Sequence, residues 1–297
     1  MSIRPVKRLT TSQLTMEGAG VRLRRAFGFG DTNEVDPFLL FDDFRGDRPD
    51  DYLAGFPWHT HRGIETITYV LAGNVDHDDS LGNKGTIGAG DVQWMTAGSG
   101  IIHQEMPHGN ERGQMHGFQL WANLPAPLKM THPRYQEVAS RDIPEVTDDD
   151  GTKARIICGT FWGRRGPVEG VAAEPQYVDI WVPPGTRRSL PVARSRNVFA
   201  YVFEGAGRFA AASEPQPVKT DVVGQDGVQA DNRSLILFDS GDEITVETRN
   251  EGVRFLLVSG TPIQEPVAWR GPIVMNTNEE LRQAFEEYRN GTFLKHA

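Results

Sequence analysis

Hydrophobic and polar residues alternate along much of the chain, and this pattern predicts β-strands that are buried on one face. The stretch Ile64–Gly73, IETITYVLAG, alternates in this way and is rich in β-branched side chains. Val92–Met106 and Gly117–Pro125 predict further strands, and Val21–Phe29 predicts an edge strand nearer the start. Because no helical period separates these strands, the pattern predicts an all-β sandwich or barrel.

The second half of the chain repeats parts of the first half. An acidic stretch with Pro and Gly at 140–153 is the candidate domain boundary. Beyond it, Tyr201–Gly205 is similar to Tyr69–Gly73, and Phe255–Pro262 is similar to Phe118–Pro125. These matches occur in the same order and at similar separations, so the sequence predicts a duplicated barrel.

One helix is predicted near the end of the chain. Positions 276–278 offer N-cap oxygens, two glutamates follow in the first turn, and Asn290–Gly291 supplies the stop. The helix carries one apolar stripe, which we expect to pack across a barrel: Leu281, Phe285 and Tyr288.

Composition and charge restrict the class of protein. A charged fraction of 24% and a hydrophobic fraction of 38% are typical of a globular protein in water. The net charge of −9 argues against direct nucleic-acid binding, which needs clustered Lys and Arg. Cys158 is the only cysteine, so no internal disulfide can form, and its neighbours predict a buried strand. The start lacks the apolar core of a signal peptide and no run reaches 18 apolar residues, so we expect a cytoplasmic protein without membrane contact.

Two pairs of polar residues in the first half suggest a metal site. His59 and His61 are two residues apart, as are His103 and Glu105, and such side chains share one face of a strand. Facing each other across a barrel, the pairs would bring three imidazoles and a carboxylate together. This ligand set suits iron, manganese, nickel, copper or zinc better than calcium or magnesium. No histidine occurs at positions 133–295, so the second barrel cannot rebuild such a site.

Glu65 is an alternative to Glu105 as the carboxylate. Glu65 is four residues after His61, so on one strand both side chains would point to the same face. On an unbroken strand, however, Glu65 would lie about 13 Å further along. A turn or bulge at Arg62–Gly63 would remove this objection, so both carboxylates stay open, with Glu105 preferred. His116 is a candidate for contact with a ligand or a metal-bound imidazole, against an expected role in packing.

Other side chains have competing interpretations. Four residues are candidates either for the wall of an apolar cavity or for the core: Trp58, Trp94, Met95 and Trp121. Five aspartates lack the spacing of an EF-hand, and we expect them in solvated loops and turn caps: Asp42, Asp43, Asp47, Asp50 and Asp51.

Several stretches resemble the pirin family of the cupin superfamily. They cover most of the chain and are dense between residues 36 and 125: Asp36–Phe44, Ala54–Gly73, His77–Pro107, Phe118–Pro125 and Gly271–Phe293. The resemblance implies a bicupin fold of two jelly-roll β-barrels with a short C-terminal helix. The implied domains are an N-terminal metal-binding barrel at 1–139, a linker at 140–153, and a degenerate second barrel with the terminal helix at 154–297.

The family resemblance also implies a cofactor and two functions. It implies Fe(II), or another divalent first-row metal, bound by His59, His61, His103 and Glu105. Some pirins are quercetin 2,3-dioxygenases, which implies an iron-dependent dioxygenase that opens flavonol-like substrates with dioxygen. In such a reaction Glu105 is the best candidate for the general base. Other pirins bind transcription regulators or metabolic enzymes, which implies the alternative of a non-catalytic iron-dependent regulator with a protein partner.

Overall fold

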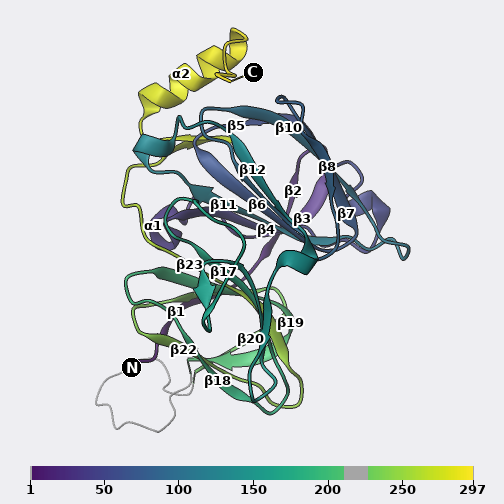
Figure 1. Ribbon diagram of the computed structural model, residues 1–297, viewed down its shortest axis with the longest axis vertical. Helices are drawn as coiled ribbons and strands as arrows, with labels where there is room; N and C mark the ends of the chain where they lie inside the picture. Colours follow the sequence, from purple (N-terminus) through teal and green to yellow (C-terminus); the bar gives the residue numbers. More distant parts are fainter. Residues whose placement is uncertain (1, 211–226, 297) are drawn as a thin grey trace. The chain divides into compact units, whose positions relative to one another are not determined.

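The computed structural model describes residues 2–210 and 227–296 (Figure 1). Antiparallel β-sheets dominate it, which confirms the all-β prediction. Contacts group the chain into two units. The first unit contains Gln13–Asp142, Gly170–Ala173 and the chain from Ile263 onward, and the second contains the chain up to Ser12, Ile143–Glu169 and Glu174–Pro262.

The first unit is built from two main sheets. One has the strand order β12-β9-β6-β11-β4-β3-β2 and the other has the order β5-β10-β7-β8. The bounds are β2 Gln13–Glu17, β3 Val21–Phe27, β4 Phe38–Asp43, β5 Phe56–His61, β6 Ile64–Ala72, β7 Asn74–Asp79, β8 Lys84–Ile87, β9 Val92–Thr96, β10 Ile101–His108, β11 His116–Asn123 and β12 Arg134–Val138. Short helical turns occur at α1 Thr32–Val35, η1 Pro49–Asp51, η2 Ala126–Leu128 and η3 Ser140–Asp142. Because β3 pairs with both β2 and β4, the expectation that it is an edge strand was wrong.

A tight turn at Gly63 carries the chain from one sheet to the other. Gly63 has a φ of +78°, and an added Cβ would lie 1.9 Å from the carbonyl oxygen of Val274, so only glycine fits here. The buried ammonium group of Lys129 donates to the carbonyls of Gly63 and Val274 at 2.9 and 3.0 Å and to Asn123 Oδ1 at 2.8 Å. Burial lowers the pKa of Lys129 to about 7. These contacts fix the turn that follows β5.

The chain from Ile263 onward adds a strand pair and a helix to the first unit. These are β24 Ala268–Arg270, β25 Ile273–Met275 and α2 Asn278–Arg289. The predicted helix begins as expected, because Thr277 and Glu280 form a capping box at its N-terminus. Leu281 and Ala284 of α2 are buried in a cluster with residues of β24 and β25.

The second unit is a separate antiparallel assembly with its own core. Its main path is β1-β21-β19-β23-β17-β14-β13, joined by β18, β20 and β22. The bounds are β1 Val6–Thr11, β13 Glu145–Thr147, β14 Lys153–Cys158, β15 Thr160–Phe161, β16 Arg164–Arg165, β17 Gln176–Val182, β18 Arg187–Pro191, β19 Asn197–Phe209, β20 Val228–Asp231, β21 Ser234–Phe238, β22 Glu243–Glu247 and β23 Val253–Gly260. Inward side chains are mainly Val, Ile, Leu and Phe. Cys158 is buried on β14, as predicted.

The two ends of the chain group differently from the expected domain division. β1 pairs with β21, so the first residues join the second unit rather than the range 1–139. The terminal helix joins the first unit rather than the range 154–297. Strand pairing and apolar packing between distant segments decide this grouping, and neither leaves a local sequence pattern.

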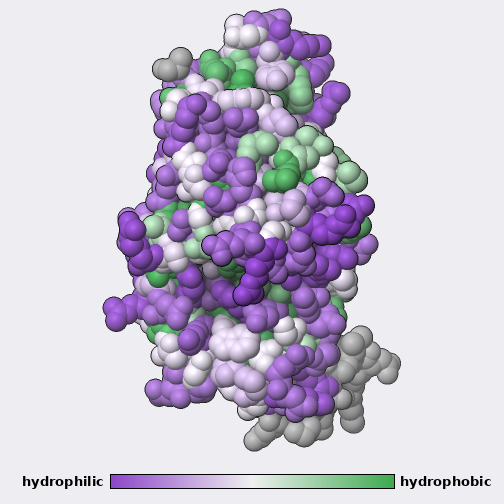
Figure 2. Space-filling model, turned by 90° about the vertical axis from the view of Figure 1, so that its right-hand side faces the viewer, coloured by the Kyte–Doolittle hydropathy of each residue, from purple (hydrophilic) through white to green (hydrophobic). Residues whose placement is uncertain are grey.

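The surface of the described residues is largely hydrophilic on the face in view (Figure 2), and their helices are short or polar. In Figure 2 hydrophilic residues cover most of the face in view, and hydrophobic residues form small separate groups. Neither helix in the described parts of the chain has the length and apolar character needed to cross a membrane.

Candidate metal centre

Three histidines meet where β5 and β10 pair. In the antiparallel register His59 lies opposite His103, and His61 lies opposite Ile101. Side chains two residues apart share a face, so the three imidazoles project to the same side of the sheet. One ring nitrogen from each lies within 4.8 Å of the others. The structure therefore brings together three of the four predicted ligands, in a cluster that can hold a metal ion.

Backbone carbonyls fix which nitrogen of two rings faces the cluster. His59 Nδ1 lies 2.9 Å from the carbonyl oxygen of Pro57, and His61 Nδ1 lies 3.3 Å from that of Pro272. When Nδ1–H donates to a carbonyl, Nε2 carries the lone pair that a metal needs. The two Nε2 atoms lie 3.0 Å apart. Two nitrogens bound at right angles to one ion at about 2.1 Å would be about 3 Å apart, so this distance fits a shared metal.

Burial favours the neutral form of the three imidazoles. Burial lowers the pKa of His59. Burial, and then the nearby His59, lower the pKa of His61 well below its usual value. The pKa of His103 is lowered in the same way by burial and by the other two rings. Since a metal binds the neutral form of histidine, the cluster is prepared for a cation without first losing protons.

The surroundings of His103 also fit a metal. The residue is 1% exposed, and neither ring nitrogen has a hydrogen-bond partner among the described residues. A buried polar atom without a partner costs about 1–3 kcal/mol, and a metal–nitrogen bond would offset that cost. Three neutral imidazoles suit a borderline first-row ion. The residues present therefore fit a divalent transition metal.

Glu105 lies beside the cluster rather than within it. The register between β10 and β5 shifts after His103, so Glu105 pairs with Phe56. Glu105 lines the same cavity as His59 but is not part of the close group of ring nitrogens. Its Oε1 accepts a hydrogen bond from the Thr68 hydroxyl at 3.1 Å. Burial raises the pKa of Glu105 to about 7, against the opposing effect of this bond.

Glu65 belongs to the opposite face of its sheet. The turn at Arg62–Gly63 does separate β5 from β6, as the alternative required. On β6, however, Thr68 lines the cavity, and Glu65 has the opposite parity. Glu65 Oε1 instead accepts from the Thr96 hydroxyl at 2.8 Å, in a fully buried position. Burial raises the pKa of Glu65 to about 7, although Thr96 opposes the shift.

A cavity of about 650 Å³ opens beside the histidines. His59, His61 and Glu105 form part of its wall. The Trp121 ring lies 5.1 Å from the His61 ring and 6.0 Å from the Trp269 ring. Further apolar side chains belong to the wall: Leu23, Phe29, Leu40, Phe44, Phe56 and Val75. The volume and the largely apolar, partly aromatic lining suit an aromatic ligand.

The four apolar candidates from the sequence divide between three environments. Trp121 lines the cavity. Trp94 and Met95 are fully buried core residues, and Trp58 is 50% exposed. The alternation along the strands could not separate these outcomes, because both faces of β9 are buried.

The prediction that Asp42 and Asp43 are solvated turn residues was wrong. Both lie on β4, and they are 4% and 1% exposed. Asp42 accepts two hydrogen bonds from Arg25 at 2.8 and 2.7 Å, and Asp43 pairs with Arg45 at 2.6 Å. Burial raises the pKa of Asp42 to about 6, while Arg25 opposes that shift. The arginine partners make burial of these carboxylates tolerable.

His116 and His77 lie apart from the cavity wall. The His116 ring packs edge-on against Phe118 with centroids 5.1 Å apart, and its Nε2 is 3.7 Å from Asp43. His77 is buried on β7 with Nε2 2.9 Å from Glu137. Neither lines the cavity, so the packing interpretation of His116 describes its position.

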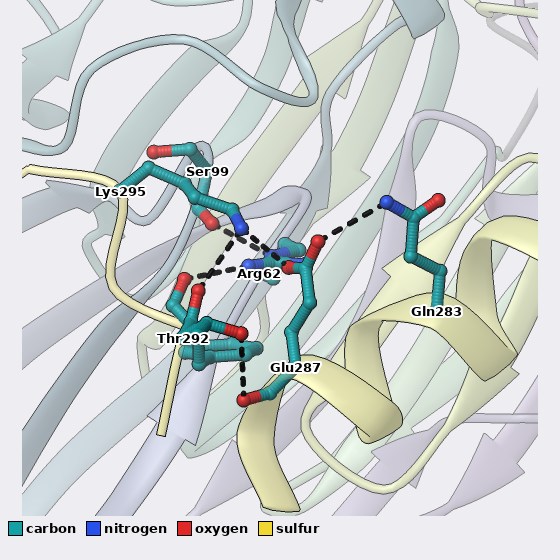
Figure 3. A network of polar contacts seen from close by, with 7 residues as sticks. Arg62, Ser99, Gln283, Glu287, Thr292 and Lys295 are labelled. Atoms are coloured by element: carbon teal, nitrogen blue, oxygen red, sulfur yellow. Dashed lines mark hydrogen bonds and ion pairs between the residues drawn. The ribbon is translucent and has the colours of Figure 1, made fainter. Parts of the chain in front are cut away.

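The chain from Ile263 onward, called the C-terminal segment below, holds His61 and Arg62 in place (Figure 3). The buried Arg62 guanidinium donates to Glu287 and to the carbonyl oxygen of Phe293, both at 2.7 Å, and lies 4.1 Å from the Phe293 ring centroid. Arg62 directly follows His61, whose Nδ1 bonds to Pro272 of the same segment. The segment therefore fixes the orientation of one predicted ligand.

Sequence reasoning missed the contributions of Arg25, Trp269 and Pro272. Trp269 and Pro272 line the cavity although they lie more than 140 residues after the other cavity residues. The stretch that begins at Gly271 resembles the pirin family, and this was the only signal for Pro272, because Trp269 lies just before that stretch. Arg25 carried no signal, because a lone arginine on a strand usually faces solvent.

Comparison with known proteins identifies the family. The pirin profile matches residues 20–122, and that of the pirin C-terminal cupin domain matches residues 177–294. A pirin-like protein from Caulobacter vibrioides is 44% identical over 99% of this chain and 100% of its own. A Pseudomonas aeruginosa protein, whose name provisionally assigns quercetin 2,3-dioxygenase activity, is 41% identical over 97% of both chains.

A solved structure supports the same assignment. The crystal structure of quercetin 2,3-dioxygenase from Acinetobacter baumannii superposes with a TM-score of 0.85 at 28% identity, and covers 98% of this chain and 99% of that chain. The first profile lies within the first unit, and the second covers most of the second unit together with the C-terminal helix that packs on the first. The chain belongs to the pirin family.

Proposed function

We propose that this protein is an iron-dependent dioxygenase that opens a flavonol-like substrate such as quercetin with dioxygen. One observation carries the proposal: two histidines of the three-histidine cluster, His59 and His61, share with Glu105 a cavity whose other walls are largely apolar. Relatives with quercetin 2,3-dioxygenase names support it at 41% and 28% identity.

The metal would be held by Nε2 of His59 and His61, by a ring nitrogen of His103, and by Glu105 as the fourth ligand. Ferrous iron supplies Lewis acidity and the one-electron chemistry that allows an aromatic substrate to react with dioxygen. Imidazole ligands also accept manganese, nickel, copper and zinc, so metal analysis belongs in the first experiment.

The protein groups position the substrate and move its proton. Trp121 and Trp269 offer ring faces for a flat substrate, and the apolar wall keeps bulk water from the reacting end. We assign Glu105 as the general base that accepts the proton of the substrate hydroxyl at a carboxylate oxygen. The Thr68 hydroxyl, 3.1 Å from Glu105 Oε1, orients this carboxylate.

The test compares protein loaded with iron under anaerobic conditions with its His61→Ala variant. The wild-type protein should bind one iron and consume dioxygen when quercetin is added, and the variant should lose both properties. His108→Ala is the matched control, because His108 is an exposed residue at the end of the same β10 strand. Full turnover by iron-free His61→Ala protein would refute the site, and iron binding without dioxygen uptake would favour the regulatory alternative.

A further inference from the structure

One polar row crosses four neighbouring strands of the cavity wall. It consists of Thr68 on β6, Gln119 on β11, Asp42 on β4 and Arg25 on β3, and each is in register with the next. All four line the cavity. Because neighbouring strands lie about 4.8 Å apart, the row extends about 14 Å away from Glu105.

Apolar side chains border this row on both sides. In one direction along the strands, Trp121 and Leu40 lie opposite each other, two residues from Gln119 and Asp42. In the other direction, Leu23 and Phe44 line the cavity two residues from Arg25 and Asp42. The polar row is thus a single band within an apolar wall. A polar group in an apolar wall costs free energy unless it has a hydrogen-bond partner. The hydrogen bonds that these four side chains make with protein atoms therefore show which of their polar atoms remain for a ligand.

The middle of the row has one acceptor atom left for a ligand. The Thr68 hydroxyl lies 3.1 Å from Glu105 Oε1 and 2.6 Å from Gln119 Oε1, but it has only one hydrogen. When the Gln119 amide is turned so that its NH₂ group donates to Thr68, the hydroxyl donates to Glu105. Gln119 then keeps its carbonyl oxygen as an acceptor.

The end of the row far from the histidines is negatively charged. Arg25 donates twice to Asp42, at 2.8 and 2.7 Å, and once to Glu17 at 2.8 Å. One guanidinium thus faces two carboxylates, and the N–H groups on those sides already donate to them. Asp42 is 4% exposed, and its oxygens keep lone pairs for another donor. A second anion would be repelled here, whereas a neutral hydroxyl would find an acceptor.

We propose that the row selects flat aromatic substrates whose remote ring carries a neutral hydroxyl, with Asp42 accepting its hydrogen and Gln119 accepting one from a nearer hydroxyl. Substrates with a carboxylate on that ring are excluded. The inference rests on the proposed function, because it places the reacting end of the substrate at the histidines. Asp42 and Gln119 are specificity residues, and Arg25 positions Asp42.

The test measures binding of flavonols without oxygen, by quenching of tryptophan fluorescence, since Trp121 and Trp269 line the cavity. The ligands are the parent flavonol, which carries no hydroxyl on ring A or ring B, two derivatives with one hydroxyl on ring A or ring B, and the two matching carboxylates. At one of the two ring positions, the hydroxyl should strengthen binding about tenfold over the parent. The carboxylate at that position should bind more weakly than the parent.

Variants then connect this preference to the row. The double variant Arg25→Met/Asp42→Leu removes both partners of the buried pair, so no charge is left buried alone, and it should bind hydroxylated and parent flavonols equally. Asp42→Asn keeps an acceptor oxygen and should regain part of the hydroxyl preference while losing the exclusion of carboxylates. Asp43→Asn is the control, because Asp43 is on the same strand but outside the cavity wall.

The outcomes separate this inference from the proposed function. An equal loss of affinity for every ligand in the double variant, or no preference in the wild-type protein, would overturn the inference. If the preference is found but iron-loaded protein consumes no dioxygen with any of the flavonols, the proposed reaction fails and the binding inference stands.

Discussion

Replacing Glu65 with Gln should make the protein more stable at alkaline pH. Burial raises the pKa of Glu65 to about 7, with smaller opposing contributions that begin with Thr96. The folded state therefore binds the Glu65 proton more tightly than the unfolded state, whose carboxyl has an ordinary pKa near 4.5. Stability from this group is fully present below pH 4.5 and is lost as the pH rises through 7.

The size of the effect follows from the two pKa values. A difference between a pKa of 4.5 in the unfolded state and about 7 in the folded state corresponds to roughly 3 kcal/mol of unfolding free energy. Glutamine keeps an oxygen that can accept from Thr96 but never ionises, so the variant should not lose this amount. Urea unfolding at pH 5 and pH 8.5 measures the difference between the proteins, which should grow with pH. The exposed Glu111→Gln is the control, and parallel pH curves for wild type and Glu65→Gln would refute the argument.

The same variant tests the choice of carboxylate. Glu65 bonds to Thr96 on the face of β6 opposite to the cavity side chain Thr68. Glu65→Gln should therefore keep its full metal content, while Glu105→Gln should lose metal to a chelator faster than wild type. Loss of metal from the Glu65 variant with retention by the Glu105 variant would reverse our assignment.

Three further variants test contacts of the turn after β5 and of the chain from Ile263 onward. Lys129→Met leaves three buried acceptors without a donor and should lower the unfolding free energy in urea by about 3 kcal/mol or more. Glu287→Ala removes the carboxylate partner of buried Arg62, so limited proteolysis should cut the C-terminal segment sooner than in wild type, and an equal rate would count against the anchor. Thr277→Ala removes the cap of α2 and should cost about 1 kcal/mol in thermal unfolding, whereas an unchanged transition would show that the cap contributes little.

The sequence predicted the histidine cluster because its geometry is local. Residues two apart on a strand share a face, and the antiparallel pairing of β5 and β10 then places His103 opposite His59. Glu105 lies two residues beyond His103, and by the same rule it should join the cluster. The register shift after His103 changes its position, and such a shift depends on the neighbouring strand rather than on the local pattern.

Long-range pairing explains what the sequence did not predict. Aspartate is depleted in strands, so DPFLLFDDF favoured a turn at Asp42. Burial of Asp42 depends on Arg25, which lies 17 residues earlier on another strand. In the same way, β1 finds its partner at Ser234–Phe238, more than 220 residues later. Alternation predicts that a strand exists, but it does not identify the strand's neighbour.

The end of β5 shows why the candidate site and the C-terminal segment form one unit. His61 donates toward the carbonyl of Pro272, and the next residue, Arg62, accepts from the Val274 N–H at 3.0 Å through its own carbonyl. The Arg62 side chain is held in turn by Glu287. These successive residues thus use opposite faces. His61 turns its Nε2 into the histidine cluster, and Arg62 anchors the segment that supplies the carbonyl of Pro272. The C-terminal segment therefore supports the orientation of His61 in the histidine cluster.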